Sequence, residues 1–152
     1  MPKRGAGSSV ACCRTVRTYG VVAAGGALGA LARWAVGRGL PHGPGAWPWA
    51  TVTVNVTGCL LIGLLLAVLL ARAPGHPWLR PFLATGVLGG YTTFSALAVD
   101  AVQLADAGRW PVALGYLLVS VVGGLAAVVV GLVLGRAAVG RPGVAEAGEG
   151  RS

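Results

Sequence analysis

The sequence predicts an all-α integral membrane protein with four transmembrane helices. Hydrophobic residues make up 55% of its 152 residues and charged residues 11%, whereas a soluble domain carries roughly 25% charged residues. Three long stretches, 39–71, 81–99 and 110–135, contain no charged side chain. The remaining charges are too few to cover a core of this size with a polar shell, which excludes a soluble enzyme and a disordered chain.

Four apolar runs have the length of about 20 residues that a helix needs to cross the hydrocarbon core. Prolines concentrate in the links between the runs, and the tryptophans lie at run boundaries, as interfacial aromatic residues do. The chain therefore divides into a basic N-terminal tail (1–18), a transmembrane domain (19–135) and a C-terminal tail (136–152) that is expected to be disordered. The predicted spans run from about Tyr19 to Val36, from about Ala50 to Ala71, from about Phe82 to Ala105 and from about Val112 to Gly135.

The residues that give the net charge of +8 are concentrated outside the spans. Lysines and arginines lie in the tails and links and form no patch of the kind that binds nucleic acid, so we expect no nucleic-acid partner. With four spans both termini lie on one side, and the greater number of basic residues on that side predicts that it is cytoplasmic. The basic residues of that side are Lys3, Arg4, Arg14, Arg17, Arg72, Arg80, Arg136, Arg141 and Arg151, against Arg38 and Arg109 on the other.

The first span is rich in small residues. Gly25 and Gly29 form a GxxxG pair, which lets helices pack closely in lipid. Arg33 follows near the end of the span, where an arginine either raises the anion concentration at a pore mouth or extends to the interface. Because four helices leave little room for a pore within one subunit, we expect an oligomer.

The second and third spans carry the most informative polar residues. Asn55 lies in mid-span, and its amide can donate a hydrogen bond either to an anion or to a neighbouring helix. Residues 86–95 read Gly-Val-Leu-Gly-Gly-Tyr-Thr-Thr-Phe-Ser, and glycine and β-branched threonine both weaken a helix. A break here would turn backbone carbonyls inward, an arrangement that holds monovalent cations in transporters. A continuous helix packed through its glycines is the alternative that these residues leave open.

Three further polar residues lie in the spans. Asp100, the only acid within a span, is a candidate proton carrier or the partner of an arginine. Tyr116 and Ser120 are four residues apart and therefore share a helix face, where their hydroxyls either form a polar track or pack with local hydrogen bonds. No histidine lies in a span and no nucleophile has a base at helical spacing, so we expect no enzyme.

Taken in order, these segments resemble the CrcB/Fluc family of fluoride channels. The matching stretches are 25–34, 53–58 and 86–95, followed by Asp100 and by the pattern Tyr116-x-x-x-Ser120-x-x-x-Gly124-Leu125. The Gly-Gly-x-Thr-Thr-Phe-Ser core is the most specific part, and the resemblance covers all four spans.

The resemblance implies an antiparallel dimer in the cell membrane that lets fluoride leave the cytoplasm passively along two interface pathways, lowering fluoride toxicity. It implies a structural sodium ion (Na+) held by the backbone carbonyls of Gly89 and Thr92. Neutral donors and phenyl ring edges suit a small anion, because they replace its water without a fixed charge that traps it. The implied pathway residues are Asn55, Phe94, Ser95, Tyr116 and Ser120, with Arg33 and Asp100 at the entrance or in support.

Leu97 stands where the family has the second phenylalanine of the pathway. Together with the uneven distribution of basic residues, this leaves two partners open, a second copy of the chain or a paralogous subunit in a heterodimer. A small proton-coupled multidrug transporter with four helices is the alternative function, although such a transporter needs an acid in its first span. A membrane scaffold without transport is a third reading, for which Asn55 would have no use.

Overall fold

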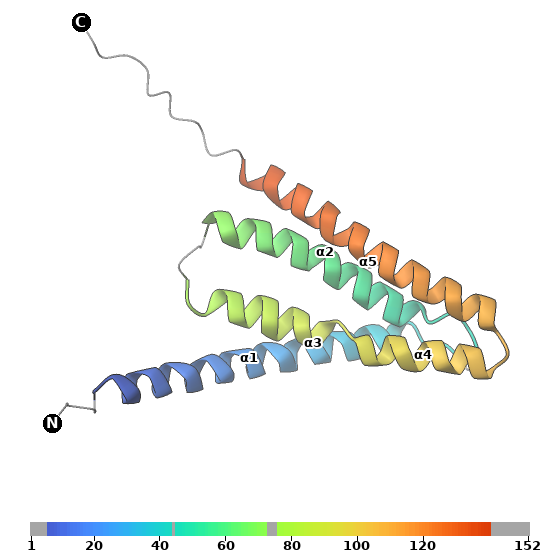
Figure 1. Ribbon diagram of the computed structural model, residues 1–152, viewed down its shortest axis with the longest axis horizontal. Helices are drawn as coiled ribbons and strands as arrows, with labels where there is room; N and C mark the ends of the chain where they lie inside the picture. The colour runs from blue at the N-terminus through green and yellow to red at the C-terminus, as the bar shows by residue number, and fades with distance from the viewer. Residues whose placement is uncertain (1–5, 44, 73–75, 141–152) are drawn as a thin grey trace, which may run out of the picture.

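The computed structural model describes residues 6–43, 45–72 and 76–140, and every regular element in these ranges is helical. The first helix begins and the last helix ends at the same end of the bundle, as an even number of spans requires (Figure 1). The third span is built from three pieces, η1, α3 and α4. The elements are α1 (Ala6–Gly39), α2 (Trp49–Arg72), the π-helix η1 (Pro81–Leu88), α3 (Gly89–Tyr91), α4 (Phe94–Asp106) and α5 (Trp110–Val139).

The prediction of four membrane spans is confirmed within the described residues, where four helices are long and apolar enough to cross a bilayer. The helices extend beyond the predicted limits. Helix α1 begins at Ala6, inside the predicted basic tail, and no proline stands between this residue and the apolar run to interrupt it. Helix α5 likewise continues to Val139. The outer parts of both predicted tails, 1–5 and 141–152, lie outside the described residues.

Small residues bring the helices into backbone contact, as the sequence predicts. A side-chain carbon at Gly29 of α1 would collide with the carbonyl oxygen of Val87. A carbon at Gly131 of α5 would collide in the same way with the carbonyl oxygen of Leu60 in α2. Helix α1 therefore packs on η1 and α3, whereas α2 packs along α5. Such contacts hold helices together in lipid, where burial of apolar surface contributes little.

The third span is broken at Thr92 and Thr93, which confirms the predicted interruption. Both residues have extended backbone, with φ −74° and ψ 157° at Thr92 and φ −149° and ψ 121° at Thr93. The side chain of Thr93 accepts a hydrogen bond from the Ala96 amide and so caps the start of α4. The third span thus consists of two helical segments joined by an extended dipeptide. The first segment is η1 continued by α3, and the second is α4.

An apolar core lies where α2, α4 and α5 meet. Its buried members include Leu97, Leu104 and Tyr116, of which Tyr116 is fully buried. Leu97 is only 7% exposed. Beyond this core, many large apolar side chains of α1, α4 and α5 face outward, as expected of helices that meet lipid or a second subunit.

Candidate ion pathway at the helix break

Asn55 holds the break in place through both atoms of its amide. Its Nδ2 donates to the carbonyl oxygen of Thr93, and its Oδ1 accepts from the backbone amide of the same residue, each at 2.9 Å. An extended residue in mid-membrane has lost its helical partners, so these two bonds replace them. Of the two readings of Asn55 from the sequence, the bond to a neighbouring helix is therefore present, and one N–H of the amide remains for an anion.

Arg33 reaches the break from α1. Its guanidinium donates to the carbonyl oxygen of Thr92 at 3.2 Å, and the side chain is partly buried. The arginine is therefore directed into the protein, toward the break, and does not simply extend along the interface. It also supplies a positive charge beside the two extended residues.

The backbone carbonyls at the break have the chemistry of a monovalent cation site. In a continuous helix the Gly89 carbonyl would accept from the Thr93 amide, but that amide bonds Asn55 instead. The Thr92 carbonyl accepts from Arg33 and retains a second lone pair. Carbonyl oxygens are the ligands that hold Na+ at broken helices, so the Gly89 and Thr92 oxygens are the type of donor that such a site uses.

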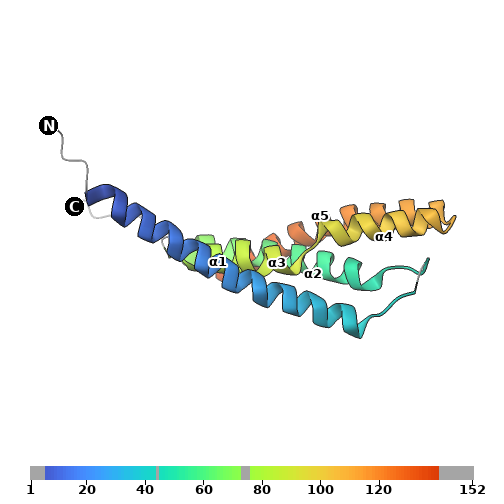
Figure 2. The same ribbon diagram turned by 90° about the horizontal axis from the view of Figure 1, so that it is seen from below.

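A cleft of about 420 Å³ leads from the α1–α2 link to the break. Its walls come from α1 and α4, which diverge toward this end, and α2 lies between them (Figure 2). Arg33 and His42 bring basic groups to the walls, and no carboxylate is among the described lining residues, although Asp100 contacts His42 and Thr51 from behind the wall. The cleft therefore favours anions. Its lining residues are Arg33, Gly37, Pro41, His42, Ala50, Thr51, Val54, Thr93 and Ala96.

Asp100 is held by hydroxyl groups. Thr51 donates to its Oδ2 at 2.6 Å and Tyr116 to the same oxygen at 3.1 Å, all three side chains being buried. His42 Nε2 lies 3.8 Å from Oδ1. Of the two readings of Asp100 from the sequence, pairing with an arginine is not what the described residues show. The only basic group among them in ion-pair range of Asp100 is His42.

Sequence reasoning did not connect Thr51 or His42 with Asp100. A signal for the first existed, because Thr51 and Asn55 are four residues apart and share the face of α2 that meets the third span. His42 lies in an irregular link, and no periodicity predicts where such a residue points.

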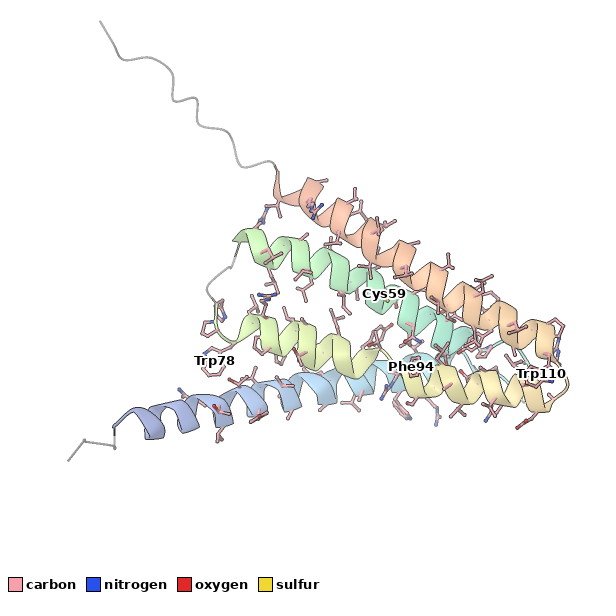
Figure 3. The ribbon with its side chains drawn as sticks, viewed as in Figure 1. Cys59, Trp78, Phe94 and Trp110 are labelled. Atoms are coloured by element: carbon pink, nitrogen blue, oxygen red, sulfur yellow. The ribbon has the colours of Figure 1, made fainter. Side chains whose placement is uncertain are left out.

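Phe94 begins α4 directly after the break (Figure 3). Ser95 is the next residue of this helix. The Phe94 side chain is 81% exposed on this chain. Ser95 is also exposed, and its Oγ lies 3.2 Å from Oγ1 of Thr93. Leu97, by contrast, packs in the core. The two positions at which the resemblance implies pathway phenylalanines thus have opposite surroundings here.

Tyr116 and Ser120 lie on the buried face of α5, as their spacing predicts. The single hydroxyl proton of Tyr116 is donated to Asp100. The Ser120 Oγ is buried and has no hydrogen-bond partner among the described residues.

The structure thus brings the predicted residues into two groups. Arg33, Asn55 and Ser95 surround the Thr92–Thr93 break, whereas Tyr116 and Asp100 form a second group through their hydrogen bond. The cleft connects the two groups, because Thr51 and Thr93 both line it.

Residues 20–132 match the family model described as CrcB-like protein, Camphor Resistance (CrcB). The chain is 50% identical over 123 residues to a protein of Paracoccus denitrificans, an alignment that covers 78% of this chain and 94% of that protein. It is 49% identical over 111 residues to a protein of Bordetella petrii, covering 73% and 85%. It is 45% identical over 120 residues to a protein of Mycobacterium bovis, covering 79% and 91%. The three relatives are named fluoride-specific ion channel FluC, the last of them FluC 1.

Proposed function

Since the chain belongs to the CrcB family, we propose that it is a fluoride-specific ion channel that lets fluoride leave the cytoplasm passively. Its four spans and its channel relatives make it a multi-pass protein of the cell membrane. The observation that supports the proposal best is the cleft, which carries basic groups and no carboxylate and ends at the neutral donors of the break. The proposed activity is transport without chemical conversion of the ion.

Fluoride passes between the cleft near Arg33 and the uncharged donors at the break. The remaining N–H of Asn55 and the hydroxyl of Ser95 replace water around the anion near the break. The exposed ring of Phe94 offers its positive edge. The buried hydroxyl of Ser120, which has no partner among the described residues, continues the series of donors, and Tyr116 and Asp100 support it through Thr51.

The proposed functional unit is an antiparallel dimer. Phe94 stands exposed on the single chain, and a second chain packed against this face would enclose it. Two chains would also bring together two sets of the Gly89 and Thr92 carbonyls, which suit Na+ as described above. A bound sodium ion would supply a positive potential that favours an anion nearby.

Leu97 bears on the identity of the second chain. Because this side chain is packed in the core, each chain presents Phe94 alone of the two family ring positions. We propose that a homodimer still conducts through pathways that contain Phe94, and that a paralogous subunit is required only if the purified chain is inactive.

The multidrug-transporter alternative is not supported. The relatives are named as fluoride channels, and Asp100 of the third span is engaged by the hydroxyls of Thr51 and Tyr116. A proton-coupled drug transporter requires an accessible membrane carboxylate that binds protons and substrate in alternation.

Liposomes that contain only this purified chain test the function. They are loaded with potassium fluoride, and a potassium ionophore starts efflux, which a fluoride electrode records. We expect rapid fluoride efflux without a proton gradient, and no comparable efflux when chloride replaces fluoride. A folded, dimeric protein without fluoride efflux would contradict the homodimeric channel, and recovery of efflux with a paralogous chain would establish the heterodimer.

A further inference from the structure

A groove between α1 and the start of η1 takes no part in the proposed fluoride pathway. It has a volume of about 520 Å³ and lies on the other side of the helix break from Phe94. One wall comes from α1 and consists of an arginine and small or medium apolar residues. The other wall is aromatic and comes from the start of the third span. The residues of this α1–η1 groove are Arg17, Gly20, Val21, Ala24, Trp78 and Phe82.

The groove exists because α1 and η1 diverge from a close contact. At Gly25 the two helices touch, since an added side-chain carbon would collide with the carbonyl oxygen of Phe82. At Gly20 the same carbon would meet no atom within 4 Å. The five residues from one glycine to the other span about 7.5 Å of helix. The space is therefore a wedge that is closed inside the membrane and opens toward the end where α1 begins.

The polarity of the α1–η1 groove changes along its length. Arg17 stands at the open end, where it is exposed and has no hydrogen bond or ion pair to any residue that the structure describes. Val21, Ala24 and Phe82 offer only apolar surface in the part nearer to Gly25. Trp78 lies at the start of the third span (Figure 3), with an apolar ring and one N–H donor, as is typical of the membrane interface.

The end of the bundle that carries the groove is basic. The two acids among the described residues, Asp100 and Asp106, both belong to α4, beyond the break. The distribution of basic residues predicts that this end faces the cytoplasm, where anionic lipids attract basic groups beside a span. The described arginines at this end are Arg17, Arg72, Arg80 and Arg136.

We propose that the α1–η1 groove binds an anionic phospholipid, with its headgroup phosphate on Arg17 and an acyl chain along Val21, Ala24 and Phe82. Guanidinium groups pair well with phosphate oxygens, and basic pockets between transmembrane helices hold phospholipid headgroups. The apolar wedge favours a lipid over a free phosphate, which has nothing to place there. The inference does not depend on fluoride transport. In the proposed antiparallel dimer, the two copies would hold one such lipid in each leaflet.

Native mass spectrometry of the purified chain tests the proposal. The protein is mixed with equal amounts of phosphatidylglycerol and phosphatidylcholine that carry the same acyl chains, and the bound fraction of each lipid is measured. We expect the wild type to prefer phosphatidylglycerol. Arg17→Gln should weaken its binding about fivefold, the effect of one arginine near a headgroup, and leave phosphatidylcholine unchanged. Arg17→Lys should keep most of the preference, and equal binding of the two lipids by the wild type would overturn the proposal.

Gly20→Leu tests the apolar part of the groove. The new side chain would enter the open space beside residue 20, and the fold should persist because leucine favours a helix more than glycine does. Binding of phosphatidylglycerol should fall although Arg17 is intact. Glycerol phosphate, which has the charge but no acyl chain, should not displace the lipid. Displacement by glycerol phosphate together with normal lipid binding by Gly20→Leu would identify a free-phosphate site and contradict the assignment to a lipid.

Arg136→Gln is the matched control, because it removes the same charge from the same end of the bundle. Arg136 lies in the last turn of α5, and within the described part of the chain α5 packs on neither α1 nor η1. This variant should bind phosphatidylglycerol as the wild type does. A loss equal to that of Arg17→Gln would show a diffuse attraction to the whole basic end and would refute a site in the groove.

The acids of the C-terminal segment 141–152 are the other candidate occupant within the chain. They are Glu146 and Glu149, and their charge also complements Arg17. Replacing both with glutamine in the full chain should leave lipid binding unchanged. A clear gain in binding would show that this segment competes for the groove and would argue against the lipid as its resident ligand.

Discussion

Asn55 and Thr93 form a two-point contact across helices α2 and α4, in which one side-chain amide bonds both the N–H and the C=O of one extended residue. The contact satisfies backbone groups that the helix break exposes at membrane depth, where unsatisfied groups are costly. Asn55 therefore both shapes the break and faces the proposed pathway.

Replacing Asn55 separates these two roles. Asn55→Ala removes both hydrogen bonds and should lower the free energy of unfolding by about 1–3 kcal/mol and abolish most fluoride flux. Asn55→Asp keeps an acceptor for the Thr93 amide but loses the donor and adds a negative charge beside the pathway. It should regain part of the stability while flux stays low. Thermal unfolding in detergent and liposome efflux measure the two effects, and full flux in either variant would contradict the assignment of Asn55 to the pathway.

Arg33 should affect flux in a way that depends on salt. Arg33→Gln removes the charge from the cleft wall and should reduce flux several-fold at low ionic strength, and by less at about 1 M salt, where charges are screened within a few ångströms. Initial efflux rates at matched fluoride concentration and varied inert salt measure this difference. Arg38 is the control, because it stacks on Trp34 at 5.5 Å and does not line the cleft. Arg38→Gln should retain nearly wild-type flux, and an equal loss in both variants would argue against a specific role for Arg33.

Phe94 and Leu97 should respond in opposite ways to truncation. Phe94→Ala removes an exposed ring and should reduce fluoride flux strongly, with little change in the stability of the single chain. Leu97→Ala leaves a cavity in the core and should cost about 2–5 kcal/mol of stability. Chemical unfolding together with flux per folded protein separates the two outcomes. If Phe94→Ala conducts normally, the ring does not contact the permeating ion.

Removal of sodium should weaken the dimer. Because the proposed site needs carbonyls from two chains, bound sodium stabilises the assembled state by about 2.7 kcal/mol at a hundredfold excess over its Kd. Exchange of sodium for a large organic cation during purification should lower the melting temperature and increase the monomer fraction in size-exclusion chromatography. Readdition of sodium should restore both. A dimer whose stability does not depend on sodium would remove Gly89 and Thr92 from the list of metal ligands.

The sequence predicts the four spans because apolar runs of membrane length admit few other structures. It also predicts the break, since glycine and threonine cluster at 86–95, and the structure locates it at Thr92–Thr93. The sequence does not predict which residues form hydrogen bonds across helices. Whether Asn55 meets an anion or a carbonyl, and whether Asp100 meets an arginine or a hydroxyl, depends on the rotation of each helix about its axis. The link that carries His42 has no periodic pattern at all.

Arg33 restrains the break from one side and Asn55 from the other, and both belong to the same chain as the break. We therefore expect the extended dipeptide to take its shape within one chain. In the proposed dimer, association would then join two surfaces that need no refolding at the centre. A newly inserted copy can consequently wait in the bilayer in a binding-ready form, and the speed of channel assembly should depend on how often two such copies meet.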